Sequence, residues 1–194
     1  MVGCVIAPAR GASLNVQNFS FENPVIDTTY LPVSLTADHW MMNGYGDIAY
    51  IPGFGTVAAG VGIFPNPSPT SSGHLNGVEG NQAAYIFSNV GNEISQGLVN
   101  AGNTNTATAF TAGVQYALTM SLADAQAMPP AGDQLLFQLY YTDNNQIRHQ
   151  VASRVVNSET LSQTDFADRM ATSCVLLAND PAIGKQITKV VIDS

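Results

Sequence analysis

The side chains that most often carry out catalysis are few in this sequence and lie far apart. The three histidines, His39, His74 and His149, form no HExxH motif or other metal-binding spacing, and no serine lies in a GxSxG motif. The pair Asp38-His39 has no nucleophile at a recognisable distance along the chain. We therefore expect the histidines to have surface or structural polar roles, and we predict that the protein is not an enzyme.

The sequence contains two cysteines, Cys4 and Cys174, and no CxxC motif. An even number of cysteines permits a disulfide in an exported protein, whereas a zinc or redox site would need closely spaced pairs. Two interpretations stay open at this point. The cysteines form a Cys4–Cys174 disulfide, within one chain or between chains, or they are two unrelated thiols.

Two features suggest contact with sugars. Aromatic rings can stack on pyranose rings, and we predict such contacts for Trp40, Tyr45 and Tyr140, with a core role as the alternative for Trp40. The segment Asn66–Ser72 reads Asn-Pro-Ser-Pro-Thr-Ser-Ser, which predicts a rigid, extended loop rich in hydroxyl groups. The side chains there that can accept O-linked sugars are Ser68, Thr70, Ser71 and Ser72.

The charge of the chain excludes two classes of partner. The formal net charge is −8, with six Lys and Arg in 194 residues. Nucleic acids and anionic membranes both require a basic surface, which so few cations cannot build. No apolar run reaches the ~18 residues that a membrane helix needs. Acidic groups in such a charge-poor chain do suit a hard cation such as calcium.

Short alternating apolar runs separated by Gly, Pro, Asn and Asp predict a single all-β domain, an antiparallel two-sheet sandwich. Gln163–Met170 is the one segment with a helical pattern, and Ala101–Thr108 is predicted to be an exposed hairpin loop. The predicted strands are Leu14–Glu22, Asp47–Ile51, Thr56–Phe64, Gln82–Ser88, Glu93–Val99, Gln115–Leu122, Gln134–Thr142, Ile147–Val156, Ala171–Ala178 and Gln186–Asp193.

Residues 1–13 precede the predicted sandwich of residues 14–194 and form an apolar arm. Its sequence before Ser13 resembles the end of a secretory signal, which is one interpretation. The other is a functional arm, which can add as a strand to a sheet edge of its own domain or of a neighbour. Head-to-tail addition that does not close makes filaments. The arm residues expected to make these contacts are Val2, Cys4, Val5 and Ile6.

Several short motifs follow one another in a fixed order. They are Asn18–Pro24 (Asn-Phe-Ser-Phe-Glu-Asn-Pro), Trp40, Gly80–Ile86 (Gly-Asn-Gln-Ala-Ala-Tyr-Ile), Ile94–Leu98, Phe110–Thr119 and Val190–Ser194. This order, over roughly residues 14–194, resembles the calcium-dependent jelly-roll modules related to galactose-binding domains. That group includes xylanase-associated carbohydrate-binding modules, exported bacterial proteins with a Pro-Glu-Pro sorting tail, and cyanobacterial indole-alkaloid cyclases.

The resemblance implies a jelly-roll topology and a structural calcium ion held between the first and last strands. Glu22 and Asp193 occupy the positions of its carboxylate ligands; the alternative is that both are ordinary exposed acids. Tyr85 falls in the strand that matches the pocket of the cyclases, but no catalytic aspartate can be matched apart from Asp193. The chain also departs from the family in ending at Asp193-Ser194, where relatives continue with a further strand.

We therefore expect a secreted, non-enzymatic structural subunit of a bacterial cell surface that assembles with itself, head to tail, through its arm. The first alternative is a calcium-stabilised carbohydrate-binding module with glycans as partners. The second is an alkaloid-cyclase-like enzyme.

Overall fold

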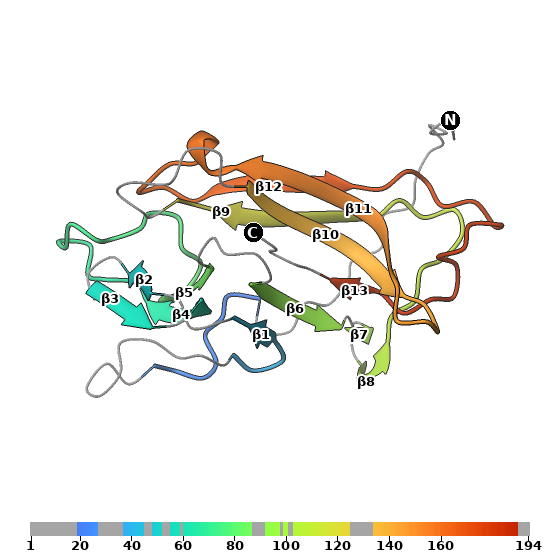
Figure 1. Cartoon of the computed structure of the whole chain (residues 1–194), viewed down its shortest axis with the longest axis horizontal. Helices are drawn as coiled ribbons and strands as arrows, with labels where there is room; N and C mark the ends of the chain where they lie inside the picture. Colours follow the sequence, from blue (N-terminus) through green and yellow to red (C-terminus); the bar gives the residue numbers. More distant parts are fainter. Residues whose placement is uncertain are drawn as a thin grey trace.

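The computed structural model describes residues 19–26, 37–44, 48–51, 55–58, 60–86, 92–97, 99–100, 103–124 and 134–189. These residues form β-strands and one short 3-10 helix, η1 (Ser158–Thr160) (Figure 1). All the ladders between the named strands are antiparallel. The prediction of an antiparallel all-β fold is therefore confirmed.

The largest sheet has five strands, and β10, one of its two long strands, is buried on both faces. Its order is β1 (Met41–Asn43), β6 (Glu93–Gly97), β13 (Thr188–Lys189), β10 (Gln134–Thr142) and β11 (Arg148–Asn157). Five consecutive residues of β10, Phe137–Tyr141, are buried. A strand covered on both faces reads as a near-continuous apolar run rather than a simple alternation. This explains the sequence Leu-Leu-Phe-Gln-Leu-Tyr-Tyr of β10.

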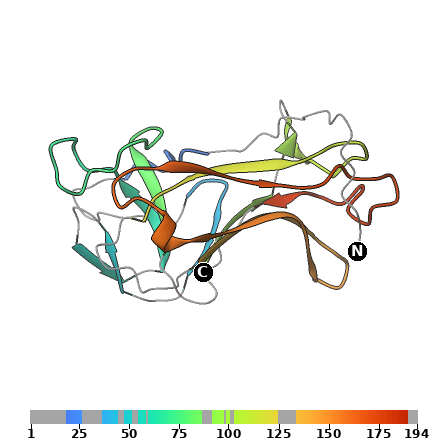
Figure 2. The ribbon, with the colours of Figure 1, turned by 90° about the horizontal axis from the view of Figure 1, so that it is seen from above.

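A second layer comes from the antiparallel pair of β9 (Ala117–Leu122) and β12 (Ala167–Thr172), which are far apart in the sequence. Burial alternates along both strands, as expected when one face meets a core and the other meets solvent. Leu122 and Ala171 of this strand pair share a buried cluster with Phe137 and Val156 of the five-stranded sheet. The two layers thus form a sandwich-like architecture, with the long strands running along the molecule (Figures 1 and 2).

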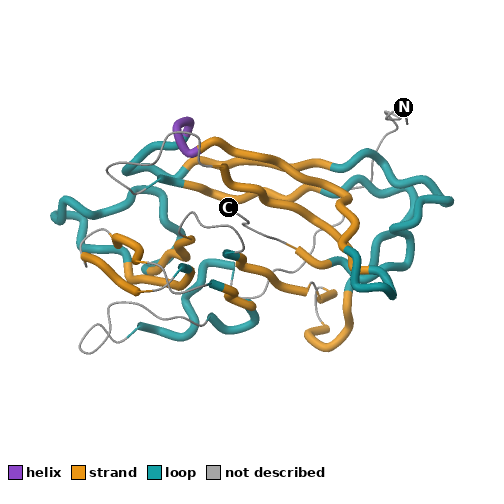
Figure 3. The backbone as a smooth tube through the Cα atoms, viewed as in Figure 1, coloured by secondary structure: helices purple, strands orange, loops and turns teal. Residues whose placement is uncertain are grey.

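Three short hairpins complete the fold. The pairs are β2 (Ile48–Ile51) with β3 (Gly55–Ala58), β4 (Val61–Pro65) with β5 (Gln82–Ile86), and β7 (Val99–Asn100) with β8 (Asn103–Ala107). Strands β2 to β5 gather at one end of the molecule, and Figure 3 shows long loops at both ends of the sandwich. Loops at the ends of a sandwich connect its strands and are where recognition residues usually lie.

The structure corrects several predicted elements. The helical interpretation of Gln163–Met170 is wrong, because residues 167–170 belong to β12 and pair with β9. The predicted strand Thr56–Phe64 is two strands, β3 and β4. The predicted strand Ala171–Ala178 starts earlier, at Ala167, and ends at Thr172. The predicted loop Ala101–Thr108 contains strand β8, and residues 19–22 of the predicted first strand lie in a turn and irregular backbone.

Candidate functional site

Two of the short motifs meet in space and form what we call the Gln82 clasp, made of residues Phe21–Ile26 and Gly80–Gln82. The Gln82 side chain is buried, and its Nε2 donates hydrogen bonds to the carbonyl oxygens of Phe21 (2.7 Å) and Pro24 (3.1 Å). Its Oε1 accepts the backbone N–H of Ile26 at 2.8 Å. One amide thus satisfies three backbone groups of a loop that has no ladder partner for them.

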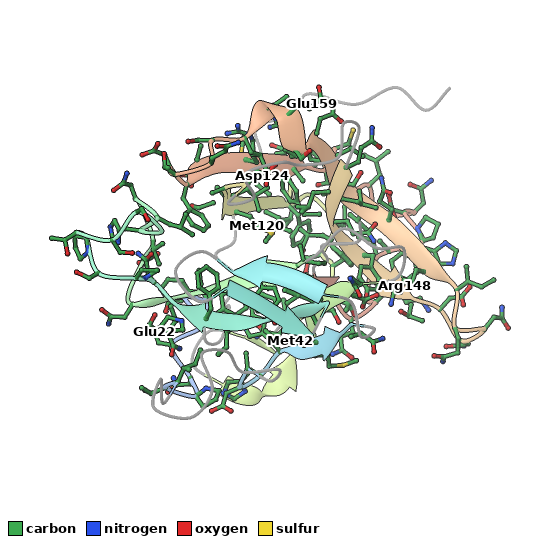
Figure 4. The ribbon with its side chains drawn as sticks, turned by 60° about the vertical axis from the view of Figure 1, so that its left-hand side comes forward. Glu22, Met42, Met120, Asp124, Arg148 and Glu159 are labelled. Carbon is green, nitrogen blue, oxygen red and sulfur yellow. The ribbon has the colours of Figure 1, made fainter. Side chains whose placement is uncertain are left out.

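The carboxylate of Glu22 is fixed by the same clasp. Its Oε1 accepts the backbone N–H groups of Asn81 and Gln82, each at 2.8 Å. Gly80 has φ +92°, and a Cβ there would lie 2.4 Å from Glu22 Oε1. The close approach and the left-handed backbone both require glycine at this position. Figure 4 shows Glu22 in this setting.

The calcium site predicted at Glu22 and Asp193 can be described only at Glu22, since Asp193 lies outside the described residues. Both clasp hydrogen bonds of Glu22 use Oε1, so Oε2 retains acceptor capacity for a cation. Within the described part of the chain, no group of three or more His, Cys, Asp or Glu side chains is arranged to hold a metal ion. Any calcium site here therefore needs backbone carbonyls or residues beyond the described ranges as ligands.

Of the three aromatic side chains predicted to stack on sugars, Trp40 is partly buried and packs against the core. Its ring lies 4.8 Å from the ring of Phe21, centroid to centroid. Both rings pack against a buried cluster of Val61, Ile94 and Tyr140, which also receives Met42 and other partly buried side chains. Met42 and Met120, labelled in Figure 4, come from β1 and β9 and join this cluster from the two layers.

Tyr140 is covered, and Tyr45 lies outside the described residues. Tyr140 is 4% exposed, and the Arg148 guanidinium lies over its ring at 4.9 Å. Arg148 Nη2 also forms an ion pair with Glu93 Oε2 at 2.7 Å. Burial raises the pKa of Tyr140, and the neighbouring charges of Arg148 and Glu93 act in opposite directions on it. The face of this ring that a sugar would need is therefore occupied by a cation–π contact.

Tyr85 has a hydroxyl group that finds no hydrogen-bond partner among the residues that the structure describes. Its Oη is buried, and this burial raises the pKa of Tyr85 to about 12. The ring packs edge-on to Phe64 at 6.2 Å. A buried hydroxyl without a partner costs about 1–3 kcal/mol, so such a group is often completed by a water molecule or a ligand.

The histidines have the polar roles that we expected from the sequence. His149 Nε2 lies 3.0 Å from Asp143 Oδ2, and its ring stacks on Tyr141 at 4.8 Å. His74 Nδ1 lies 2.7 Å from the carbonyl oxygen of Pro67, and His39 is exposed in a turn with φ +68°. The contacts of His149 and His74 each hold a turn or a loop end in place.

The loop predicted to carry O-linked sugars is closed by Asn66, whose side chain pairs with both backbone groups of Leu75 (2.9 and 3.0 Å). Ser68, Thr70 and Ser72 are exposed, whereas Ser71 is half-buried. The Ser71 hydroxyl accepts the N–H of Gly73, and those of Ser68 and Thr70 bond to each other. Ser68, Thr70 and Ser72 are therefore the accessible hydroxyls of this loop.

Cys174 is disulfide-bonded and lies on an exposed segment directly after β12. Cys4, the other cysteine of the chain, lies outside the described residues, as do the other arm residues Val2, Val5 and Ile6. The pairing of Cys4 with Cys174 therefore stays a prediction.

No protein-family model matches the chain, and no curated protein matches it. No helix among the described residues is long and apolar enough to cross a membrane.

The most important residues that sequence analysis missed are Gly80 and Gln82 as partners of the loop around Glu22. Both lie in quoted motifs, but the motifs are about 60 residues apart and nothing in their composition says that they touch. The ion pair of Arg148 with Glu93 was missed for the same reason, since the two residues belong to separate strands, β11 and β6.

Proposed function

We propose that the protein is a non-enzymatic, extracellular structural subunit that assembles head to tail into a filament or surface polymer through its N-terminal arm, residues 1–13. The observation that carries this proposal is the disulfide at Cys174, a residue that is exposed at the surface of the sandwich. Disulfides form and persist in oxidising compartments, which supports export. An exposed disulfide can join a separate segment to the outside of the sandwich.

The rigidity of the loops supports a structural role. Polar side chains fix several loops to backbone groups: Gln82 at the clasp, Asn66 at Leu75, and Asp143 at the N–H groups of Asn145 and Ile147. Loops held in this way suit a building block whose contacts must not change shape. Enzyme sites more often need loops or lids that move.

Cys4 is the partner that we propose for Cys174. An arm that reaches a site on its own domain can make the same contacts with a neighbouring copy, because exchange of an identical element between copies changes few contacts. When the arm of each copy binds to the next copy, the chain of contacts does not close into a ring and a filament grows. We propose that the polymer uses this exchanged form.

Electron microscopy and light scattering on the full-length, oxidised protein test the proposal. The wild type should form filaments or large particles, and the Val5→Asp/Ile6→Asp variant should be monomeric because charged groups would be buried in the contact. Met41→Asp, at an exposed apolar residue of β1, is the control and should still assemble. A wild type that remains monomeric at all concentrations would overturn the proposal.

One observation favours a second candidate, the alkaloid-cyclase-like enzyme. The buried hydroxyl of Tyr85, which has no hydrogen-bond partner within the described ranges, stays neutral at ordinary pH and could donate a proton or a hydrogen bond to a bound molecule. If this candidate holds, indole as a probe should raise the melting temperature of the wild type and not that of Tyr85→Phe. Equal melting curves of the wild type with and without indole would exclude the cyclase candidate.

A further inference from the structure

The segment after β12 presents an uncharged, partly apolar surface around the disulfide. We call residues Thr172–Ala178 the Cys174 strip; it contains no charged residue. Cys174 and Leu177 are exposed, and Leu177 is 50% exposed. The strip lies at the end of the molecule opposite the β2–β5 hairpins (Figures 1 and 3).

The backbone of the Cys174 strip is fixed by one buried side chain and by hydrogen bonds. Leu176 is buried in the cluster that contains Phe110 and Tyr116, so it anchors the segment to the core. The N–H of Ser173 donates to the carbonyl of Tyr116 at 2.9 Å, and the Ser173 hydroxyl donates to the carbonyl of Cys174 at 2.7 Å. The exposed residues of the strip are therefore presented on a fixed backbone, as a docking surface requires.

We infer that the Cys174 strip is the docking surface for the N-terminal arm, which in the proposed polymer comes from a neighbouring copy; the inference rests on the proposed function and adds to it the location of the contact. The disulfide identifies the occupant, since Cys4 is the only other cysteine in the chain. The arm sequence Val2–Ala9 is, like the strip, free of charged residues. A bond at Cys174 places the neighbours of Cys4 within reach of Leu177, three residues along the strip.

Hydrogen exchange of residues 1–9 in the full-length, oxidised protein tests this inference, with Leu177→Glu as the variant. The arm should be protected in the wild type, and Leu177→Glu should raise its exchange rates about tenfold without breaking the disulfide. Met170→Glu is the matched control, because Met170 is 52% exposed on β12 and lies outside the strip. It should leave the exchange of the arm unchanged.

The outcomes separate this inference from the proposed function. If polymers form but Leu177→Glu leaves the exchange of the arm unchanged, the docking surface is wrong and the assembly stands. If the arm responds to Leu177→Glu in a protein that is always monomeric, the docking surface stands and head-to-tail assembly is overturned. An arm that exchanges freely in the wild type would overturn the docking surface outright.

Discussion

Single side chains in this protein do their work mainly by completing the hydrogen bonds of loops, and Gln82 is the clearest case. Gln82→Leu removes three hydrogen bonds and leaves the Phe21 and Pro24 carbonyls and the Ile26 N–H unpaired. A buried unpaired group costs about 1–3 kcal/mol, but Pro24 is exposed and Phe21 and Ile26 are half-buried, so water replaces part of the loss. We therefore expect the free energy of unfolding to fall by about 2–4 kcal/mol. Urea denaturation measures this change. Gln134→Leu, at an exposed glutamine, should change stability by less than about 0.5 kcal/mol.

Glu22 belongs both to the clasp and to the predicted calcium site, and one substitution can distinguish these two roles. Glu22→Gln keeps an oxygen that can accept the N–H groups of Asn81 and Gln82 but loses the charge that a cation needs. We therefore expect calcium to raise the melting temperature of the wild type and not that of Glu22→Gln, with EDTA-treated protein as the reference. Glu79→Gln, at an exposed acid nearby, should retain the calcium response. A response that survives Glu22→Gln would argue against this carboxylate as a ligand.

The ionisation of Asp143 makes the stability of the protein depend on pH in the acid range. The hydrogen bond with His149 is the largest cause that lowers the pKa of Asp143, followed by the N–H of Ile147. A carboxyl group whose pKa is lowered by folding contributes stability above its unfolded pKa, near 3.8, and loses it as the pH falls through the lower folded value. The melting temperature should thus fall less steeply below pH 4 in Asp143→Asn than in the wild type. Parallel pH curves for the two proteins would contradict this.

At the scale of elements, the loop around Glu22 and the strand β5 depend on one glycine. Gly80→Ala places a Cβ against Glu22 Oε1 at a φ of +92°, whereas Gly113→Ala has φ +77° and meets no atom within 4 Å. In both variants, left-handed backbone strain should lower the free energy of unfolding by about 1–2 kcal/mol. In Gly80→Ala, the clash of the new Cβ with Glu22 Oε1 should lower the free energy of unfolding by about 1–3 kcal/mol more. Equal losses in chemical denaturation would show that Glu22 moves aside freely.

The elements also show what sequence analysis could and could not provide. Strand β10 was predicted with correct bounds, because a long run of Leu, Phe and Tyr bounded by Gly and Asp has few alternatives. Gln163–Met170 was misread as helical because its local sequence lacks a strand alternation, and pairing with β9 decides its conformation. The contact of Gln82 with the loop at Phe21 spans 61 residues, and local patterns carry no information on such contacts.

At the scale of the whole molecule, the sequence was sufficient for the antiparallel all-β class, and it also shows how few cations the chain has. The alternating strands and the low number of cations are properties of the entire chain, so small local errors do not change them. The assembly is different, because it depends on which copy supplies the partner of Cys174. A single sequence is compatible with a bond inside one chain and with a bond between two chains.

The mass of the oxidised protein under denaturing, non-reducing conditions tests the central claim most directly. The account predicts a ladder of multiples of the 20.4 kDa chain that collapses to a single species on reduction, and its loss in Cys4→Ser. A single oxidised species of 20.4 kDa, in material purified without reducing agent, would contradict head-to-tail assembly through the Cys174 disulfide.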